Sequence, residues 1–128
     1  MVSVSYEIDR EHRLVRIRMQ GALRAQDLLA VTSAMQSDAE LNPEWGVLVD
    51  TREVTEAPRY SEMQQFVNIA RRSPMRDDSR RVFLVNSPVL YGVARMASTL
   101  AAEYGRQYQV CREEADALRW IAGGPEAG

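Results

Sequence analysis

The sequence predicts a single α/β domain with a mixed, mostly parallel five-stranded sheet and four helices. Short apolar runs that suit strands alternate along the chain with longer segments whose apolar residues repeat at helical spacing. With 128 residues, 45% of them hydrophobic and 27% charged, the chain has the size and composition of one globular domain. All prolines fall between the expected elements or at a helix start, where a missing backbone N–H is tolerated: Pro43, Pro58, Pro74, Pro88 and Pro125.

The N-terminal segment predicts a hairpin followed by a helix. Residues 2–8 and 14–20 both alternate apolar with polar side chains, and a polar turn joins them. This pattern indicates two antiparallel strands at a sheet edge with one face in water. From Gln26 to about Asp38, apolar residues recur three and four positions apart, which predicts the first helix. Asp27 then suits the positive end of its dipole.

The middle of the chain predicts a central strand and a second helix. Residues 47–50 form a short apolar run closed by an acid, which is typical of a parallel strand covered on both faces. A loop is expected from residue 51 to 59. Ser61 stands three residues before Gln64, the spacing of a capping box, so Ser61 is predicted to cap a helix that ends at Ser73-Pro74.

Residues 80–104 predict a strand that leads directly into a third helix. The apolar run at 82–85 suits a buried strand, and turn residues follow it. Gly92 and its small neighbours are predicted to let this helix approach the sheet closely. Gly105 lies where a helix C-terminal cap is expected. The expected buried stripe consists of Val89, Val93, Met96, Ala97, Leu100, Ala101 and Tyr104.

The C-terminal segment predicts a last strand around residues 107–110 and a short helix at 115–121. The element order is therefore ββαβαβαβα, in which right-handed crossovers join parallel strands and the first strand lies antiparallel at the edge. Residues 1–122 are expected to form the single domain, and residues 123–128 a flexible C-terminal tail.

Composition excludes several classes of protein. The net charge of -2 gives no reason to expect nucleic-acid binding, although all 16 basic residues are arginine. No apolar run approaches the roughly 20 residues that span a bilayer, and the N-terminus lacks a signal-peptide pattern. A single cysteine, Cys111, rules out an internal disulfide. A cytoplasmic location is therefore expected.

No catalytic or metal site is predicted. His12 is the sole histidine and falls in the expected edge turn, and Cys111 falls in a different strand as a small buried hydrophobe. A catalytic triad, a Cys-His pair or a histidine metal site has no residues from which to form. We therefore expect no enzymatic activity and no cofactor.

Three segments, together with the order of elements, resemble one family. They are residues 47–52 (VLVDTR), 90–96 (LYGVARM) and 114–121 (EADALRWI). The chain resembles the bacterial SpoIIAA-like proteins over about residues 2–121. These proteins belong with the STAS domains of anti-sigma-factor antagonists and share their fold with CRAL-TRIO lipid carriers. The resemblance implies a non-enzymatic regulatory module that binds a protein partner, such as a regulator or kinase.

The resemblance also bears on phosphorylation. Phosphorylated antagonists carry a serine within an Asp-Ser-Ser-Gly signature at the start of the helix after the central strand. Ser61 is the matching candidate here, without the preceding acid or the following glycine. The resemblance therefore implies an interaction module that can lack a working phosphoswitch. The alternative role of Ser61 is that of a helix N-cap.

Two strand ends supply candidate residues for a partner or ligand surface. Asp50, Thr51 and Arg52 end the central strand, where Arg52 is available to grip a carboxylate or phosphate. Alternatively, Asp50 accepts hydrogen bonds from loop amides, as strand-ending acids often do.

At the next strand end, Asn86, Ser87, Tyr91 and Arg95 flank the start of a helix, whose amides attract anions. Tyr91 and Arg95, one turn apart, could share a bound group. Two further possibilities stay open. The CRAL-TRIO relationship implies an apolar pocket between helices and sheet for a lipid or other small hydrophobe, and strand faces left uncovered could form a homodimer.

Overall fold

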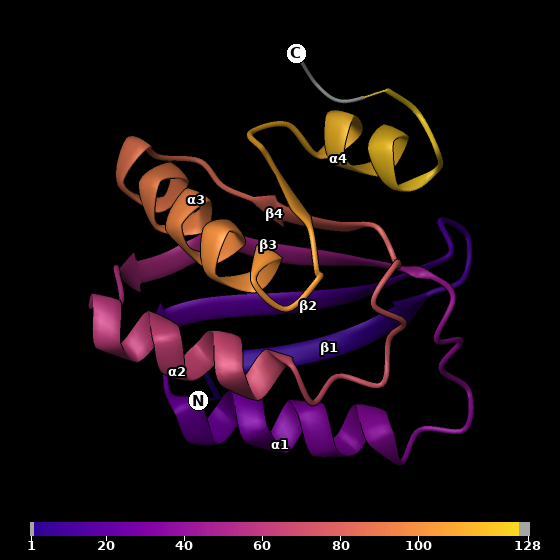
Figure 1. Ribbon diagram of the computed structural model, residues 1–128, viewed down its shortest axis with the longest axis horizontal. Coiled ribbons are helices and arrows are strands. Elements are labelled where there is room, and N and C mark those ends of the chain that lie inside the picture. Colours follow the sequence, from indigo (N-terminus) through magenta and orange to yellow (C-terminus); the bar gives the residue numbers. More distant parts are fainter. Residues whose placement is uncertain (1, 126–128) are drawn as a thin grey trace.

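A five-stranded sheet with helices on both faces forms the centre of the molecule (Figure 1). The computed structural model describes residues 2–125. The strands are β1 (Val4–Asp9), β2 (Leu14–Ala22), β3 (Gly46–Glu56), β4 (Arg81–Leu84) and β5 (Tyr108–Cys111). The helices are α1 (Ala25–Gln36), α2 (Tyr60–Ala70), α3 (Pro88–Ala102) and α4 (Glu114–Ile121). The predicted order of elements is confirmed.

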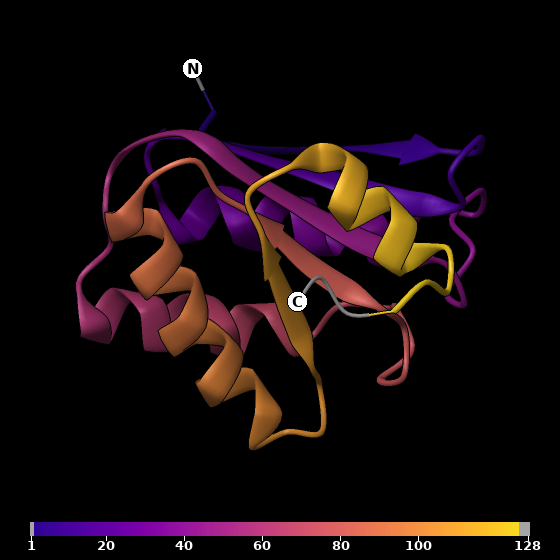
Figure 2. The same ribbon diagram turned by 90° about the horizontal axis from the view of Figure 1, so that it is seen from above.

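Strand order in the sheet follows chain order, β1-β2-β3-β4-β5. β1 is antiparallel to β2 and the remaining pairs are parallel. Because the crossovers between successive parallel strands share one hand, α1, α2 and α3 lie on the same face of the sheet. α4 packs on the opposite face against β3, β4 and β5, as the view from above shows (Figure 2).

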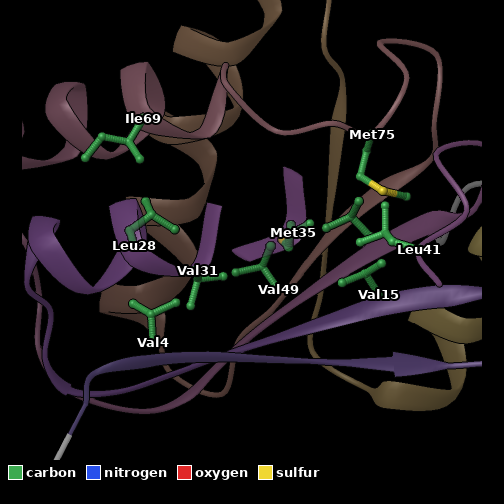
Figure 3. Packing of buried hydrophobic residues seen from close by; sticks show 10 residues of the cluster. Val4, Val15, Leu28, Val31, Met35, Leu41, Val49, Ile69 and Met75 are labelled. Carbon is green, nitrogen blue, oxygen red and sulfur yellow. The ribbon is translucent and has the colours of Figure 1, made fainter. Parts of the chain in front are cut away.

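The first half of β3, residues 47–49, is buried on both faces of the sheet, as its apolar run predicts. Val47 and Val49 join the core beneath α1 and α2, where Val49 lies near Val31 and Met35 (Figure 3). Leu48 points the other way and packs under α4. The core on the α4 face consists of Leu14, Leu48, Val82, Leu84, Cys111 and Ala117.

β3 continues beyond its apolar run, so the predicted loop from residue 51 is wrong. The strand extends to Glu56 because its second half pairs with the end of β2, with Gln20 opposite Glu53 and Gly21 opposite Val54. Most side chains in this extension are exposed, so no hydrophobic alternation marks it in the sequence.

The start of α2 also differs from the prediction. Arg59 is the N-cap and Ser61 is the second helical residue, so Ser61 does not cap the helix. The carboxylate of Glu62 accepts a hydrogen bond from the Arg59 backbone N at 3.0 Å. Both Ser61-x-x-Gln64 and Arg59-x-x-Glu62 have the spacing of a capping box. The carboxylate of Glu62 is charged, so it accepts a stronger hydrogen bond from the N-cap backbone than the amide of Gln64 would.

The buried face of α3 is rotated from the predicted stripe. Its buried residues are Leu90, Ala94, Ala97 and Ala101, whereas Val89 and Met96 are 63% and 45% exposed. Both sets fit helical spacing, and the set that contains the three alanines is the buried one. The predicted packing role of Gly92 is wrong, since it is exposed and a Cβ there would meet nothing within 4 Å.

Glycines end α3 and follow α4. Gly105 adopts the left-handed φ of 78° expected of a glycine after a helix. The Gly124 carbonyl accepts a hydrogen bond from Arg80 at 2.9 Å, and its amide donates to Arg119 at 3.0 Å. Residues 126–128 of the expected flexible tail lie outside the described residues. Within residues 2–125, no helix has the length and apolar character needed to cross a membrane.

Two glycine substitutions test this packing. A Cβ on Gly46 would lie 2.5 Å from Ile121 Cγ2 and 3.1 Å from the Arg80 carbonyl oxygen, so Gly46→Ala is expected to lower the free energy of unfolding by about 1–3 kcal/mol. Gly92→Ala is expected to raise it by about 0.5–1 kcal/mol, because alanine loses less chain entropy in an exposed helix. Urea denaturation measures both. Equal stability of Gly46→Ala and the wild type would contradict the close packing of α4 on the start of β3.

Candidate functional site

A polar groove lies on the sheet face beside α4. Alternation along β2 and β3 directs Arg16, Arg18, Asp50 and Arg52 to this face, where Glu114 of α4 meets them. The polar groove is lined by Glu7, Asp9, Arg16, Arg18, Met19, Asp50, Arg52, Glu53, Asn86 and Glu114. The part of the sheet that α4 leaves uncovered is therefore mostly charged at this groove.

Opposite charges alternate along the polar groove. The Arg52 side chain donates to both carboxylate oxygens of Asp50, at 3.0 and 2.8 Å. Arg52 Nη2 also lies 3.4 Å from Glu114 Oε1, which in turn accepts a hydrogen bond from Arg16 Nη1 at 2.8 Å. This chain of contacts links β2, β3 and α4, and it holds the guanidinium of Arg52 in place.

The contacts of Asp50 lower its pKa. Burial raises the pKa of this carboxyl, but the hydrogen bonds from the Arg52 side chain and backbone, with the charges of Arg52 and Arg16, outweigh burial and bring the pKa below its ordinary value. The Arg52 backbone N donates to Asp50 Oδ1 at 3.1 Å. Asp50 thus has the structural contacts expected of an acid at this position, in addition to facing the polar groove.

Thr51 is separated from Asp50 and Arg52 by the alternation of β3. Its side chain is 9% exposed, and its hydroxyl donates to the Leu84 carbonyl oxygen at 2.9 Å. It lines a cavity on the opposite face of the sheet. The three neighbouring candidates therefore belong to two different surfaces.

The candidates after β4 have mainly local contacts. Asn86 Nδ2 donates to the Arg52 carbonyl oxygen at 3.1 Å, which ties the end of β4 to β3 at the polar groove. Ser87 is the N-cap of α3, with its hydroxyl accepting from the Leu90 backbone N at 3.1 Å. These two side chains thus fix the joint between β4 and α3.

Tyr91, Arg95 and Ser61 do not join the polar groove. The Tyr91 ring lies beneath the guanidinium of Arg112, at 4.6 Å, while Arg95 is exposed one turn further along α3. Ser61 is exposed on α2, in the helical layer on the other side of the sheet from Asp50 and Arg52. The sheet therefore divides the candidates that the sequence suggested would share one surface.

An apolar cavity of about 110 Å³ lies between α2, α3 and the sheet. Ile17 and Val49 line it from the sheet, and Thr51 contributes from the same face. The two helices supply mainly apolar walls: Met63, Phe66, Val67, Leu90, Val93, Ala94, Ala97 and Ala101. The cavity occupies the place between helices and sheet where the sequence left open a pocket for a small hydrophobe.

The apolar cavity has unlike ends. α2 and α3 both run antiparallel to the parallel strands, so Pro58 and Leu90 border the cavity near their first residues, and Arg71 and Tyr104 border it beyond their last. The Arg71 guanidinium stacks on the Tyr104 ring at 3.7 Å. Arg106 also lines this end and donates to the Ala70 carbonyl oxygen at 2.6 Å.

Sequence reasoning missed the partners of the expected site. In the sequence, Arg16 is a polar residue of an alternating strand and Glu114 is an acid at a helix start. Arg16 and Glu114 are 98 positions apart along the chain, so nothing local predicts the hydrogen bond between them. The contact between Arg71 and Tyr104 was not predicted either, because Tyr104 was expected in the buried stripe of the third helix and Arg71 follows a different helix. Only the parallel direction of α2 and α3 brings these two side chains together.

Neither Cys111 nor His12 lines the polar groove or the apolar cavity. Burial raises the pKa of the Cys111 thiol, with Asp116 adding to the effect, which keeps the thiol protonated. His12 Nδ1 lies 2.8 Å from Asp9 Oδ2 in the turn between β1 and β2. Within the part of the chain that the structure describes, no three His, Cys, Asp or Glu side chains group as metal ligands.

Comparison with known proteins identifies the architecture. No family model matches the chain, and no curated protein matches it. The structure is similar to the crystal structure of an uncharacterised protein from the DUF3478 family with a SpoIIAA-like fold, from Shewanella loihica PV-4. The TM-score is 0.64, and the match covers 92% of this chain and 91% of that chain. The chain has a SpoIIAA-like fold. At 15% sequence identity the likeness establishes the SpoIIAA-like fold alone, and it confirms the architecture expected from the sequence.

The lowered pKa of Asp50 makes its contribution to stability depend on pH. A carboxyl whose pKa is lower in the folded state stabilises that state above its unfolded pKa of about 3.9 and loses this effect as the pH falls through the folded value. Asp50→Asn is therefore expected to lower the free energy of unfolding by about 1–2 kcal/mol at pH 7 and by much less at pH 2, measured by urea denaturation.

Glu40→Gln is the matched control, because it removes a carboxylate from an exposed ion pair with Arg10, and such pairs contribute little. It is expected to change the free energy of unfolding by less than about 0.5 kcal/mol at either pH. A loss in Asp50→Asn that stays the same size at pH 2 would show that the charge of Asp50 is not its cause.

Proposed function

We propose that the protein binds a small hydrophobic ligand in the apolar cavity, without catalysing a reaction. The observation that carries this proposal is the cavity itself, walled by apolar side chains from the sheet and two helices. Ligand sites are typically concave and apolar with a few polar groups at the margin. The volume of about 110 Å³ is comparable to that of an engineered cavity of about 150 Å³ that binds benzene.

The apolar lining of this space supports the proposal. Protein cores are close-packed, so side chains that border an unfilled space make fewer contacts than side chains in a filled core. Ala94 and Ala97 line the cavity from α3, where larger side chains would reduce its volume. A ligand in the cavity would supply the missing contacts. The relationship between the SpoIIAA-like fold and CRAL-TRIO lipid carriers agrees with this role, as an analogy between folds.

Ala97→Leu tests the proposal by filling the cavity with a side chain. The variant is expected to be at least as stable as the wild type and to bind octan-1-ol at least about tenfold more weakly, because leucine occupies the ligand's space. Amide NMR titration measures affinity and urea denaturation measures stability. Ala102→Leu is the control, since Ala102 is exposed on the same helix and is expected to leave binding unchanged. Absence of octan-1-ol binding to the wild type at millimolar concentration would refute the proposal.

A regulatory protein-protein interaction is the second candidate function. Large apolar side chains are exposed at the starts of two adjacent helices, Tyr60 at 52% and Val89 at 63%. Ser61, next to Tyr60, is also exposed. A phosphate on Ser61 would lie at a helix N-terminus near Arg59, where negative charge is favoured. These features support docking of a partner such as a regulator or kinase at this edge of the sheet.

Ser61→Asp tests the regulated form of this second function. Partners captured from the source cells by the wild-type chain are expected to bind Ser61→Asp with at least about fivefold changed affinity, because the added charge alters the docking edge. Ser33→Asp is the control, since Ser33 is exposed on α1. If each captured partner binds Ser61→Asp and the wild type equally well, phosphorylation of Ser61 does not regulate the interaction.

A further inference from the structure

Charge is distributed unevenly around the apolar cavity. Near the first turns of α2 and α3 its boundary is apolar, formed by Leu23, Pro58 and Leu90. At the other end it is bordered by Arg71 and Arg106, and within residues 2–125 these two arginines are the charged side chains that line it. A ligand in the cavity thus meets hydrocarbon along its length and positive charge at one end.

A third arginine, Arg81, adds to the positive charge at this end, and both Arg81 and Arg106 are buried. Arg81 is 1% exposed and donates to backbone carbonyl oxygens, including that of Ser79 at 3.1 Å. Arg106 is 9% exposed and donates to the carbonyl oxygens of Ala70 and Arg71, while its acidic partner Asp77 has a side chain that is 73% exposed. Because water screens Asp77 more than it screens the buried guanidinium groups, the local potential stays positive.

Of the two arginines that line the cavity, Arg106 has Asp77 as an acidic partner and Arg71 has none among residues 2–125. The Arg71 guanidinium carbon lies over the Tyr104 ring, 3.7 Å from its centroid. Stacking uses the flat face of a guanidinium, and Arg71 is exposed, so the N–H groups in the plane of the guanidinium can reach a ligand. Two of these N–H groups can grip a carboxylate or phosphate in a bidentate pair.

We infer that the ligand of the apolar cavity is an anionic amphiphile, with a short hydrocarbon chain inside the cavity and a carboxylate or phosphate bound by Arg71. This inference rests on the proposed binding of a hydrophobic ligand and assigns its chemical class. A neutral hydrophobe would gain nothing from Arg71. A cationic amphiphile would be repelled by Arg71, Arg81 and Arg106 together.

Four probes with the same chain test the inference on the full-length protein: octanoate, octyl phosphate, octan-1-ol and octylammonium. Amide NMR titration at pH 7 is expected to give at least about tenfold tighter binding for one of the anions than for octan-1-ol, and the weakest binding for octylammonium. The tighter of the two anions identifies the head group. Arg71→Gln is expected to reduce anion affinity to that of octan-1-ol for the same variant, so that the preference for an anion is lost.

Arg72→Gln is the matched control. It removes the same charge from the adjacent exposed position, which does not line the cavity, and is expected to retain the preference for an anion. Equal affinity of octan-1-ol and both anions overturns the inference while the hydrophobic-ligand function stands. Equal losses in Arg71→Gln and Arg72→Gln overturn the role of Arg71. Failure of all four probes to bind the wild type removes the proposed function as well.

Discussion

Burial of β3 on both faces is the constraint on which the rest of the structure depends. Val47 and Val49 must be covered by α1 and α2, and Leu48 by α4, so one short run of residues requires a layer on each side of the sheet. The same alternation continues past the apolar run. It directs Asp50 and Arg52 to the polar groove and Thr51 to the apolar cavity. One strand thereby separates two surfaces of opposite character.

The two surfaces differ in what they leave unsatisfied. In the polar groove, Asp50, Arg52, Glu114 and Arg16 satisfy one another, so a partner would have to replace contacts that already exist. The apolar cavity holds empty space that no side chain fills. A ligand gains dispersion contacts there without breaking any. This difference is why the cavity has the stronger case for function, although the sequence drew attention first to the strand ends.

Local patterns predicted the order and type of the elements because the spacing of apolar residues differs between strands and helices. Sequence reasoning failed where distant segments decide the outcome. The second half of β3 is a strand because β2 lies beside it. Two sets of apolar residues on α3 fit helical spacing, and only the packing of the helix in the folded chain decides which set is buried. A cavity forms where side chains from several elements do not fill the space between them, and the spacing of residues along the sequence does not show this. The link from Arg52 to Glu114 likewise requires α4 to fold back onto the sheet.

The agreement between strand order and chain order has a consequence for how the chain folds. Each strand pairs with the strand that precedes it in the chain, so the sheet can form by adding one strand at a time. Contacts between segments that are close in sequence favour fast folding. The α4 face is the exception. Leu48, Val82 and Leu84 become buried on this face only when α4, the last helix, packs against them. A chain still emerging from the ribosome would carry this patch exposed until residues 114–121 were made, and in that interval it would be most prone to aggregate.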